Sequence, residues 1–135
     1  MLHALAQAKQ GDYCFGCVIV QGNRIIASAN NTVKTDRDPL AHAEIKAIRL
    51  AVAELGITNL ETCTIYTTVE PCPMCMGAII LAKVGRLVYG ASTEELKSLA
   101  PVIAVSSREI AAHAPFKIEV IGGILSDDCL MPFRK

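Results

Sequence analysis

The sequence contains no tryptophan, and its other aromatic residues are three phenylalanines and three tyrosines. Few side chains are therefore available to stack on the bases of a single-stranded nucleic acid. Charge of one sign is not in excess either, because 13 basic and 13 acidic residues give a net charge of zero. Proteins that bind nucleic acids usually carry a basic excess that neutralises phosphates. The composition thus argues against a nucleic-acid partner, although it leaves a local basic patch open.

Long hydrophobic runs are also missing from the sequence. No stretch approaches the roughly 20 apolar residues that a membrane-spanning helix needs. The first residues, MLHALAQAKQGD, lack the basic start and the long apolar segment of a signal peptide. We therefore expect a cytoplasmic protein with no membrane partner. In that compartment, the six cysteines are expected to be metal ligands or buried thiols rather than disulfides.

Strand-like and helix-like segments alternate along the 135 residues, which we interpret as a single domain over residues 1–135. We expect helices at 2–9, 40–56 and 73–85, short helices at 94–100 and 106–114, a hairpin over 14–30, a loop over 30–38, and strands at 63–69, 86–91 and 116–123. Pro39 stands where the second helix can begin, and Gly56 stands where it should end. The 73–85 helix is apolar nearly all round and is expected to be buried. This alternation predicts an α/β layer fold with a partly parallel sheet and helices on both faces.

Two of the predicted helices begin with residues that can bind a metal. Cys72 and Cys75 are three apart, so they are neighbours on a helix and can share one ion. With His42 they supply three of the sulfur and nitrogen ligands that zinc prefers, which leaves a fourth position for water, as in catalytic sites. Glu44 is the nearby base that can accept a proton from that water. Because His42 and Glu44 are two apart, both can face one centre only if it lies off the end of their helix.

Two other interpretations of the cysteine pair stay open at this point. Cys72 and Cys75 could form a thioredoxin-like redox pair. Alternatively, they could join Cys14 and Cys17 in a structural zinc site with four cysteine ligands. The stretch CFGCVIV reads as a strand, however, where residues three apart point to opposite faces. We therefore interpret the remaining cysteines as buried thiols, at positions Cys14, Cys17, Cys63 and Cys129. The two other histidines, His3 and His113, are interpreted as surface residues.

The motifs carry a resemblance to a known family. His42-Ala43-Glu44 followed by Pro71-Cys72-Pro73-Met74-Cys75 matches the H-x-E and P-C-x-x-C signature of zinc deaminases. The chain resembles the cytidine deaminase-like superfamily, in the branch with guanine deaminases, fungal cytosine deaminase and bacterial tRNA adenosine deaminases. The stretches FGCVIV, NNTVKTDRDPLAHAEIKAIR, TIYTTVEPCPMCMGAII and GRLVYGA match in order and cover most of the chain.

This resemblance implies a three-layer α/β/α fold with a central five-stranded mixed sheet, one zinc ion per subunit and a homodimer. It implies that His42, Cys72 and Cys75 hold the zinc and that Glu44 is the catalytic proton shuttle. Asn31 matches the asparagine that hydrogen-bonds the base, and the backbone N–H of Ala43 matches a further substrate contact. The sequence also departs from close relatives, which have proline and alanine at the positions of Cys14 and Cys17.

The two nearest branches predict different substrates. After VYGA, tRNA adenosine deaminases carry a basic segment, whereas this chain has STEELKSLAPVIAV. Guanine deaminases resemble NNTVKTDRDPLAHAE better, but their acidic and aromatic C-terminal stretch is not found here. We expect a deaminase of a free base or small nucleoside, with a guanine-like aminopurine favoured. The alternatives are a tRNA adenosine deaminase, a cytosine deaminase, and a zinc-binding scaffold without turnover.

Overall fold

The computed structural model describes residues 1–134, so Lys135, the last residue of the predicted domain, lies outside the described residues. The strands are β1 (Gly16–Gln21), β2 (Arg24–Asn30), β3 (Cys63–Val69), β4 (Arg86–Ala91) and β5 (Glu119–Ile121). The helices are α1 (Leu2–Ala8), α2 (Val33–Asp36), α3 (Ala43–Leu55), α4 (Pro73–Leu81), α5 (Thr93–Leu96), α6 (Ser107–Ala111) and α7 (Ser126–Leu130), followed by the 3-10 helix η1 (Met131–Phe133).

The five strands form one mixed sheet in the order β2-β1-β3-β4-β5. Strand β1 runs antiparallel to both β2 and β3, whereas β3, β4 and β5 are parallel. The parallel strands are joined by α4 and by the segment that holds α5 and α6, as parallel connections require. The predicted five-stranded mixed sheet is therefore confirmed.

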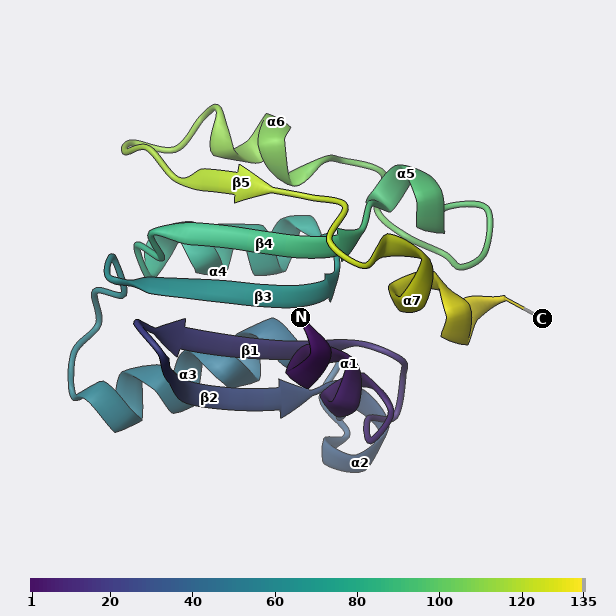
Figure 1. Ribbon diagram of the computed structural model, residues 1–135, viewed down its shortest axis with the longest axis horizontal. Helices are drawn as coiled ribbons and strands as arrows, with labels where there is room; N and C mark the ends of the chain where they lie inside the picture. Colours follow the sequence, from purple (N-terminus) through teal and green to yellow (C-terminus); the bar gives the residue numbers. More distant parts are fainter. Residues whose placement is uncertain (135) are drawn as a thin grey trace.

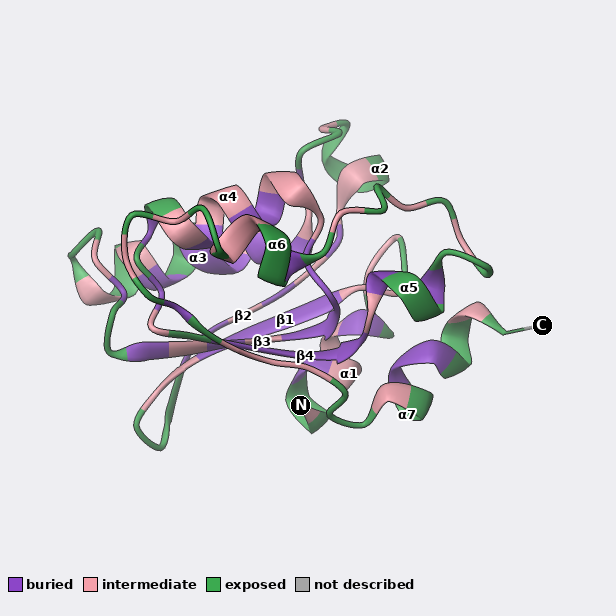
Figure 2. Cartoon of the chain, turned by 90° about the horizontal axis from the view of Figure 1, so that it is seen from above, coloured by how far each residue is buried: buried purple, intermediate pink, exposed green. Residues whose placement is uncertain are grey.

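Helices cover both faces of the sheet, which makes the three layers that the sequence predicts. Figure 2 shows α3, α4 and α6 on one face, with α1 and α7 on the other. Figure 1 looks onto the face of the sheet, with α3 and α4 behind the strands. The main core lies between the sheet and α3 and α4, and a smaller apolar cluster lies under α7. Among residues 1–134, none of the helices combines the length and the hydrophobicity of a membrane crossing.

Two glycines allow helices to approach the strands closely. A Cβ atom at Gly16 would collide with the backbone of α1 at Ala4 and Ala8. At Gly90 in β4, it would collide with the Cys129 side chain of α7 and with the backbone of β3. Both contacts lie on the face opposite α3 and α4, so these glycines let α1 and α7 close the third layer.

The central strands and several ends agree with the sequence prediction. β3 and β4 have the predicted bounds of 63–69 and 86–91, and the hairpin turns at Gly22 with φ +59°. Helix α3 ends at Leu55 and is capped by Gly56, which has φ +67°. The predicted short helices exist but are shorter, as α5 and α6, and the predicted last strand is reduced to β5. The predicted loop over 30–38 contains the short helix α2.

The predicted start of the second helix at Pro39 is wrong. The Asp38 carboxylate accepts a hydrogen bond from the Leu40 N–H at 2.9 Å, and the Asp38 carbonyl accepts one from Ala41 at 3.1 Å. These bonds hold a turn, so α3 begins only at Ala43, with His42 at its N-cap. The delay places His42 just outside the helix.

The expectation that the 73–85 helix is buried all round is also wrong. Helix α4 ends at Leu81, and Lys83 follows with φ +55°. Cys75, Met76 and Ile79 are buried, but the Leu81 side chain is 84% exposed. The helix therefore has a buried face toward the sheet and an apolar outer face.

Candidate metal centre and active site

The sheet topology gathers the candidate residues at one edge. Because β1 is antiparallel to its neighbours, the residues before β1 meet the residues after β2, β3 and β4. That edge thus holds the segment before Gly16, Asn31 after β2, the 70–72 segment after β3 and Thr93 after β4. Helices α3 and α4 begin at the same edge. This is the position where ligands bind in open α/β sheets, outside the carboxyl ends of the parallel strands.

The three predicted metal ligands come together at the N-termini of α3 and α4. His42 is the N-cap residue of α3, and Cys72 is the N-cap residue of α4, both with extended backbones. Cys75 lies one turn into α4 and is buried. Pro73 occupies the first helical position, where its missing N–H costs no hydrogen bond. The N-cap positions explain how His42 and Glu44 can serve one centre off the end of α3.

The distances in this cluster fit a zinc ion. The Nδ1 atom of His42 lies 3.5 Å from the Sγ atom of Cys75 and 3.7 Å from that of Cys72. All three donor atoms lie within 4.8 Å of one another. Nitrogen at about 2.0–2.1 Å and sulfur at about 2.3 Å from a tetrahedral zinc ion are about 3.6 Å apart. Three ligands of this kind leave one position open, which favours a catalytic over a structural zinc site.

The pKa values of the three clustered groups depend on one another. Hydrogen bonding from the Cys75 thiol, and then from His42, lowers the pKa of Cys72 to about 4. The same contact with Cys72, together with burial, raises the pKa of Cys75. The hydrogen bond to Cys72 also raises the pKa of His42. Without a metal ion, the Cys72 sulfur thus favours the thiolate form, whereas Cys75 and His42 favour their protonated forms. A metal ion that binds all three groups would displace those protons.

Glu44 lies in the first turn of α3 and is only 8% exposed. Its Oε2 atom lies 3.5 Å from the Sγ atom of Cys75, so the carboxylate borders the metal cluster. Burial is the main cause that raises the pKa of this carboxyl group. The geometry therefore places a carboxylate beside the ligands without making it one of the clustered three.

Asn31 follows β2 and is 3% exposed. Its Oδ1 accepts a hydrogen bond from the Val33 N–H at 3.1 Å, which orients the amide and leaves Nδ2 as the donor for another group. Its backbone carbonyl accepts from the Asp12 N–H at 2.8 Å, and its own N–H donates to the Phe15 carbonyl at 3.3 Å. Asn31 is thus held on three sides while it lines the cavity described below.

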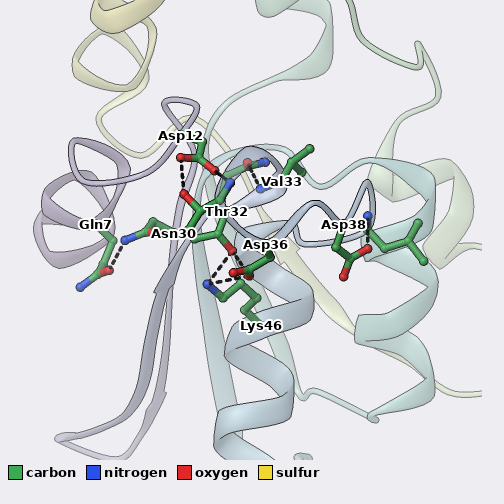
Figure 3. A network of polar contacts seen from close by, with 11 residues as sticks. Gln7, Asp12, Asn30, Thr32, Val33, Asp36, Asp38 and Lys46 are labelled. Atoms are coloured by element: carbon green, nitrogen blue, oxygen red, sulfur yellow. Dashed lines mark hydrogen bonds and ion pairs between the residues drawn. The ribbon is translucent and has the colours of Figure 1, made fainter.

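A polar network fixes the loop that follows Asn31 (Figure 3). Lys46 reaches from α3 and donates from Nζ to the Thr32 Oγ1 at 2.7 Å, and it lies 3.9 Å from the Asp36 carboxylate. The Thr32 hydroxyl donates to Asp36 at 2.6 Å. Asp12 accepts from the N–H and the hydroxyl of Thr35, at 2.7 and 2.9 Å, and the N–H bond is the main cause that lowers the Asp12 pKa. The loop is thereby tied to the helix that carries Glu44.

Ala43 is buried and opens α3 between His42 and Glu44. Its side chain is not among the cavity-lining groups, whereas those of both neighbours are. As the first helical residue, its N–H has no acceptor within the helix. Ala43 can therefore contribute only a backbone donor.

A cavity of about 620 Å³ opens beside the metal cluster. Asn31, His42, Glu44 and Cys72 line it, so it brings these predicted site residues together. Its far wall is apolar and is formed by Leu96, Ala100, Pro101, Val102, Ile103 and Phe133. Its carboxylates are those of Asp12, Glu44 and Glu70, and no lysine or arginine among residues 1–134 lines it.

The other cysteines behave as predicted with one exception. All six cysteines are free, and Cys17, Cys63 and Cys129 are buried. Cys14 is only half-buried, so the prediction for it is wrong: it lies before β1 and lines the cavity. Cys14 and Cys17 therefore do not extend the metal cluster, which consists of His42, Cys72 and Cys75 in the described chain. His3 and His113 are exposed, as predicted.

Sequence reasoning missed Glu70, which is buried at the end of β3 and lines the cavity. The sequence offers one signal for Glu70: it is a charged residue that stands between the apolar end of a strand and the P-C-x-x-C motif. Its hydrogen-bond partners lie far along the chain, at Thr93 and Ser107, so the sequence gives no pattern that reveals them.

Comparison with known proteins agrees with this geometry. The family described as "Cytidine and deoxycytidylate deaminase zinc-binding region" matches residues 1–91. The chain is 38% identical over 132 residues to a probable cytosine deaminase of Schizosaccharomyces pombe, covering 93% of this chain and 80% of that protein. It is 51% identical over 77 residues to the guanine deaminase of Bacillus subtilis, covering 57% and 49%. It is 42% identical over 117 residues to the tRNA(Ile)-lysidine synthase of Deinococcus deserti, covering 87% of this chain but only 21% of that longer protein.

Solved structures share the fold at lower sequence identity. A tRNA:A34 deaminase, studied for A-to-I editing at the wobble position, superimposes with a TM-score of 0.85 at 31% identity, covering 97% of this chain and 96% of that one. The guanine deaminase of Nitrosomonas europaea gives a TM-score of 0.80 at 28% identity, covering 97% and 76%. The matched motif region, the clustered His42, Cys72 and Cys75, and the shared fold lead to one conclusion: the chain belongs to the cytidine and deoxycytidylate deaminase family and forms a zinc-binding domain of the hydrolytic deaminase type.

Proposed function

We propose that this chain is a zinc-dependent hydrolase that removes the exocyclic amine of a free nucleobase or small nucleoside as ammonia, with a guanine-like aminopurine favoured. The observation that best supports this substrate class is the cavity beside His42, Cys72 and Cys75. Carboxylates and apolar side chains line it, and its described lining residues include no lysine or arginine. A substrate with phosphates would find no cationic partner there. Its volume of about 620 Å³ suits a base or nucleoside.

The proposed chemistry assigns each site residue one role. His42, Cys72 and Cys75 would hold the zinc ion, which when bound supplies a Lewis acid that makes a water molecule acidic enough to react at neutral pH. Glu44 accepts a proton from the attacking water and passes it to a ring nitrogen of the base. It then carries a second proton to the leaving amine, which departs as ammonia while the ring carbon keeps the oxygen. Water and the aminated base are thus converted to ammonia and the oxo base.

Two donors orient the base in this proposal. The Asn31 Nδ2 group donates into the cavity, because its Oδ1 is already occupied by the Val33 N–H. The Ala43 N–H donates from the first turn of α3 to a carbonyl or ring acceptor. An aminopurine such as guanine offers acceptors for both donors and an amine on a ring carbon. The 51% identity to a guanine deaminase over 77 residues supports the same choice.

The second candidate is a tRNA adenosine deaminase, favoured by the TM-score of 0.85 to a tRNA:A34 deaminase. The segment after β4 argues against it. Lys97 is the only basic residue between Ser92 and Val105, and it pairs with Glu94 at 2.5 Å. The two glutamates of this segment outnumber its single lysine, so the segment would repel the phosphates of a tRNA rather than bind them. The net charge of zero points the same way.

Ammonia release from zinc-loaded protein tests the proposal. The panel comprises guanine, adenine, cytosine, their nucleosides, aminated triazines and pterins, and a tRNA anticodon stem-loop. We expect turnover of a free base or nucleoside, led by guanine. Turnover of only the stem-loop would contradict the proposal, and turnover led by cytosine would replace guanine with the cytosine alternative. No turnover by protein that binds zinc would favour the scaffold without catalysis.

We also propose that the chain works as a homodimer in the cytoplasm. The outer face of α4 carries Met74 and Leu81, seven residues apart, and the 84% exposed Leu81 supports a protein contact there. Six free cysteines are typical of a reducing compartment. Light scattering after size-exclusion chromatography tests the assembly. We expect the mass of two chains, and the mass of one chain at all concentrations would contradict it.

A further inference from the structure

The Glu70 side chain is a buried carboxylate that the proposed chemistry does not use. It is 7% exposed and stands between the end of β3 and Cys72. Its Oε2 accepts a hydrogen bond from the Thr93 N–H at 2.8 Å. Its Oε1 accepts from the Ser107 N–H and from the Ser107 hydroxyl, both at 2.7 Å. Both oxygens are therefore engaged by donors of the protein.

These donors belong to two different helices. Thr93 is the first residue of α5, and Ser107 is the first residue of α6 (Figure 1). The first N–H groups of a helix have no acceptor within it, so Glu70 satisfies one orphan donor of each helix. Ser107 has no exposed surface and Thr93 is 7% exposed, so water does not readily replace the carboxylate. Bonds of this kind, with a charged acceptor, are stronger than those between neutral groups.

The chain between these two anchors forms the apolar wall of the cavity. Leu96 and the 100–103 segment lie between Thr93 and Ser107, and all five of these residues line the cavity. The segment from 97 to 106 has no helix or strand to hold it. Glu70 in turn is fixed to β4, because its N–H donates to the Ala91 carbonyl at 2.8 Å. One side chain thus joins both ends of the wall to the strand end that leads to the metal ligand Cys72.

We propose that Glu70 is a positioning residue that sets the distance between the apolar wall and the metal centre, and thereby controls substrate affinity. This role rests on the proposed deaminase function of the cavity. Glu70 acts through Thr93 and Ser107 rather than through the reacting atoms. Loss of the clamp should weaken substrate binding while it leaves zinc binding and the chemical step largely intact.

The variant Glu70→Gln tests the clamp with little change of shape. An amide has one acceptor oxygen, so its NH₂ group must face either the Thr93 N–H or the Ser107 donors, and one anchor is lost. We expect KM to rise about tenfold while kcat changes by less than about threefold. Ser107→Ala removes one of the three hydrogen bonds and keeps both backbone contacts, so a smaller rise in KM is expected.

Glu95→Gln is a matched control on the outer side of α5. The exposed Glu95 also makes three hydrogen bonds, to the Ser92 N–H, the Ser92 hydroxyl and the Ser126 hydroxyl, at 2.8, 3.0 and 2.9 Å. It does not line the cavity. We expect this variant to lower the melting temperature without raising KM. An unchanged KM in Glu70→Gln, with a melting temperature lowered as in the control, would show a merely structural role and overturn the proposal.

Two readouts do not depend on turnover. Zinc content should stay at that of the wild type in Glu70→Gln, and hydrogen exchange should accelerate at residues 97–106 but not at residues 31–36. Loss of zinc, or unchanged exchange at 97–106, would overturn the proposal. If Glu70→Gln does not fold, the same exchange pattern is measured on Ser107→Ala. If no substrate is found for the wild type, the proposed function fails, while exchange still shows whether the clamp exists.

Discussion

The two sides of the cavity differ in the polarity of their residues. On the side of α2 and α3, the loop after Asn31 is held by a polar network in which Lys46 reaches Thr32 and Asp36 (Figure 3). On the opposite side, the 100–103 segment is apolar and depends on distant anchors. The polar side places donors and a carboxylate beside the metal cluster and suits the chemical step. The 100–103 segment has no group that can react, so in the proposed function its contribution is to select the substrate by shape.

The largest effect is expected from removing Glu44, the proposed proton carrier on the polar side. Glu44→Gln keeps the size of the side chain but cannot accept a proton, so kcat should fall at least about 100-fold, as is usual for general acid–base catalysis. Zinc content should remain unchanged, because Glu44 is not one of the three clustered ligands. Rates of ammonia release and metal analysis on the same samples check both statements.

Glu54→Gln is the control for this variant. Glu54 lies on the same helix, α3, and its exposed carboxylate pairs with Arg24 at 2.5 Å on the surface. It should retain wild-type rates. Loss of zinc from Glu44→Gln would mean that Glu44 supports the metal site and would contradict its role as a proton carrier.

A smaller effect is expected from loosening the polar side. Lys46→Met removes the hydrogen bond to Thr32 and the ion pair with Asp36, so the loop after Asn31 loses its tie to α3. KM should rise about three- to tenfold, which corresponds to the usual net value of one hydrogen bond, about 1 kcal/mol. Steady-state kinetics on the preferred substrate measure this change.

Arg49→Met controls for the loss of a positive charge on α3, because Arg49 is exposed. It should leave KM unchanged. Equal rises of KM in both variants would indicate that charge on α3, and not the tie to Thr32, is responsible. A rise of KM in Lys46→Met but not in Arg49→Met would show that the polar side also affects substrate affinity. Glu70→Gln is expected to raise KM from the opposite side of the cavity.

The smallest effect is expected from alkaline pH, which acts on the apolar side. Cys129 packs with Val69, Leu96 and Leu130 in the cluster beneath the apolar wall, and its burial raises its thiol pKa from 9.0 to about 11. A raised pKa favours the protonated thiol in the folded state. Its contribution to stability is therefore complete below about pH 9 and is lost as the pH rises toward about 11.

Urea unfolding at about pH 8 and about pH 10.5 measures this loss in the wild type and in Cys129→Ala. The free energy of unfolding should fall with pH in both proteins, because burial also raises the thiol pKa of Cys17 and Cys63. The fall should be smaller in Cys129→Ala, which lacks one of the ionising thiols. Equal falls would show that Cys129 ionisation does not govern the stability of this side.

The sequence predicted the polar side better than the apolar side, for physical reasons. β3 and β4 are runs of β-branched and apolar residues, so their bounds follow from local pattern. His42, Cys72 and Cys75 follow from ligand chemistry and short spacing. The start of α3 could not be predicted, because the Asp38 side chain holds a turn that delays the helix beyond Pro39.

The apolar side depends on contacts between distant residues. The partners of Glu70 are 23 and 37 residues away, and no local pattern predicts that a charged side chain is buried there. The exposure of Cys14 also depends on tertiary structure, since the residue lies before β1 rather than within it. The substrate is hard to predict for the same reason, because the apolar wall of the cavity is assembled from α5, the 100–103 segment and Phe133.

Titration of metal-stripped protein with zinc, with ammonia release as the readout, shows whether a zinc ion at His42, Cys72 and Cys75 is needed for turnover. We expect no activity without zinc, a rise with added zinc that ends at one ion per chain, and no recovery in Cys72→Ser, which lacks one of the three clustered side chains. Full deaminase activity in the metal-stripped protein would contradict the claim that His42, Cys72 and Cys75 form the catalytic centre.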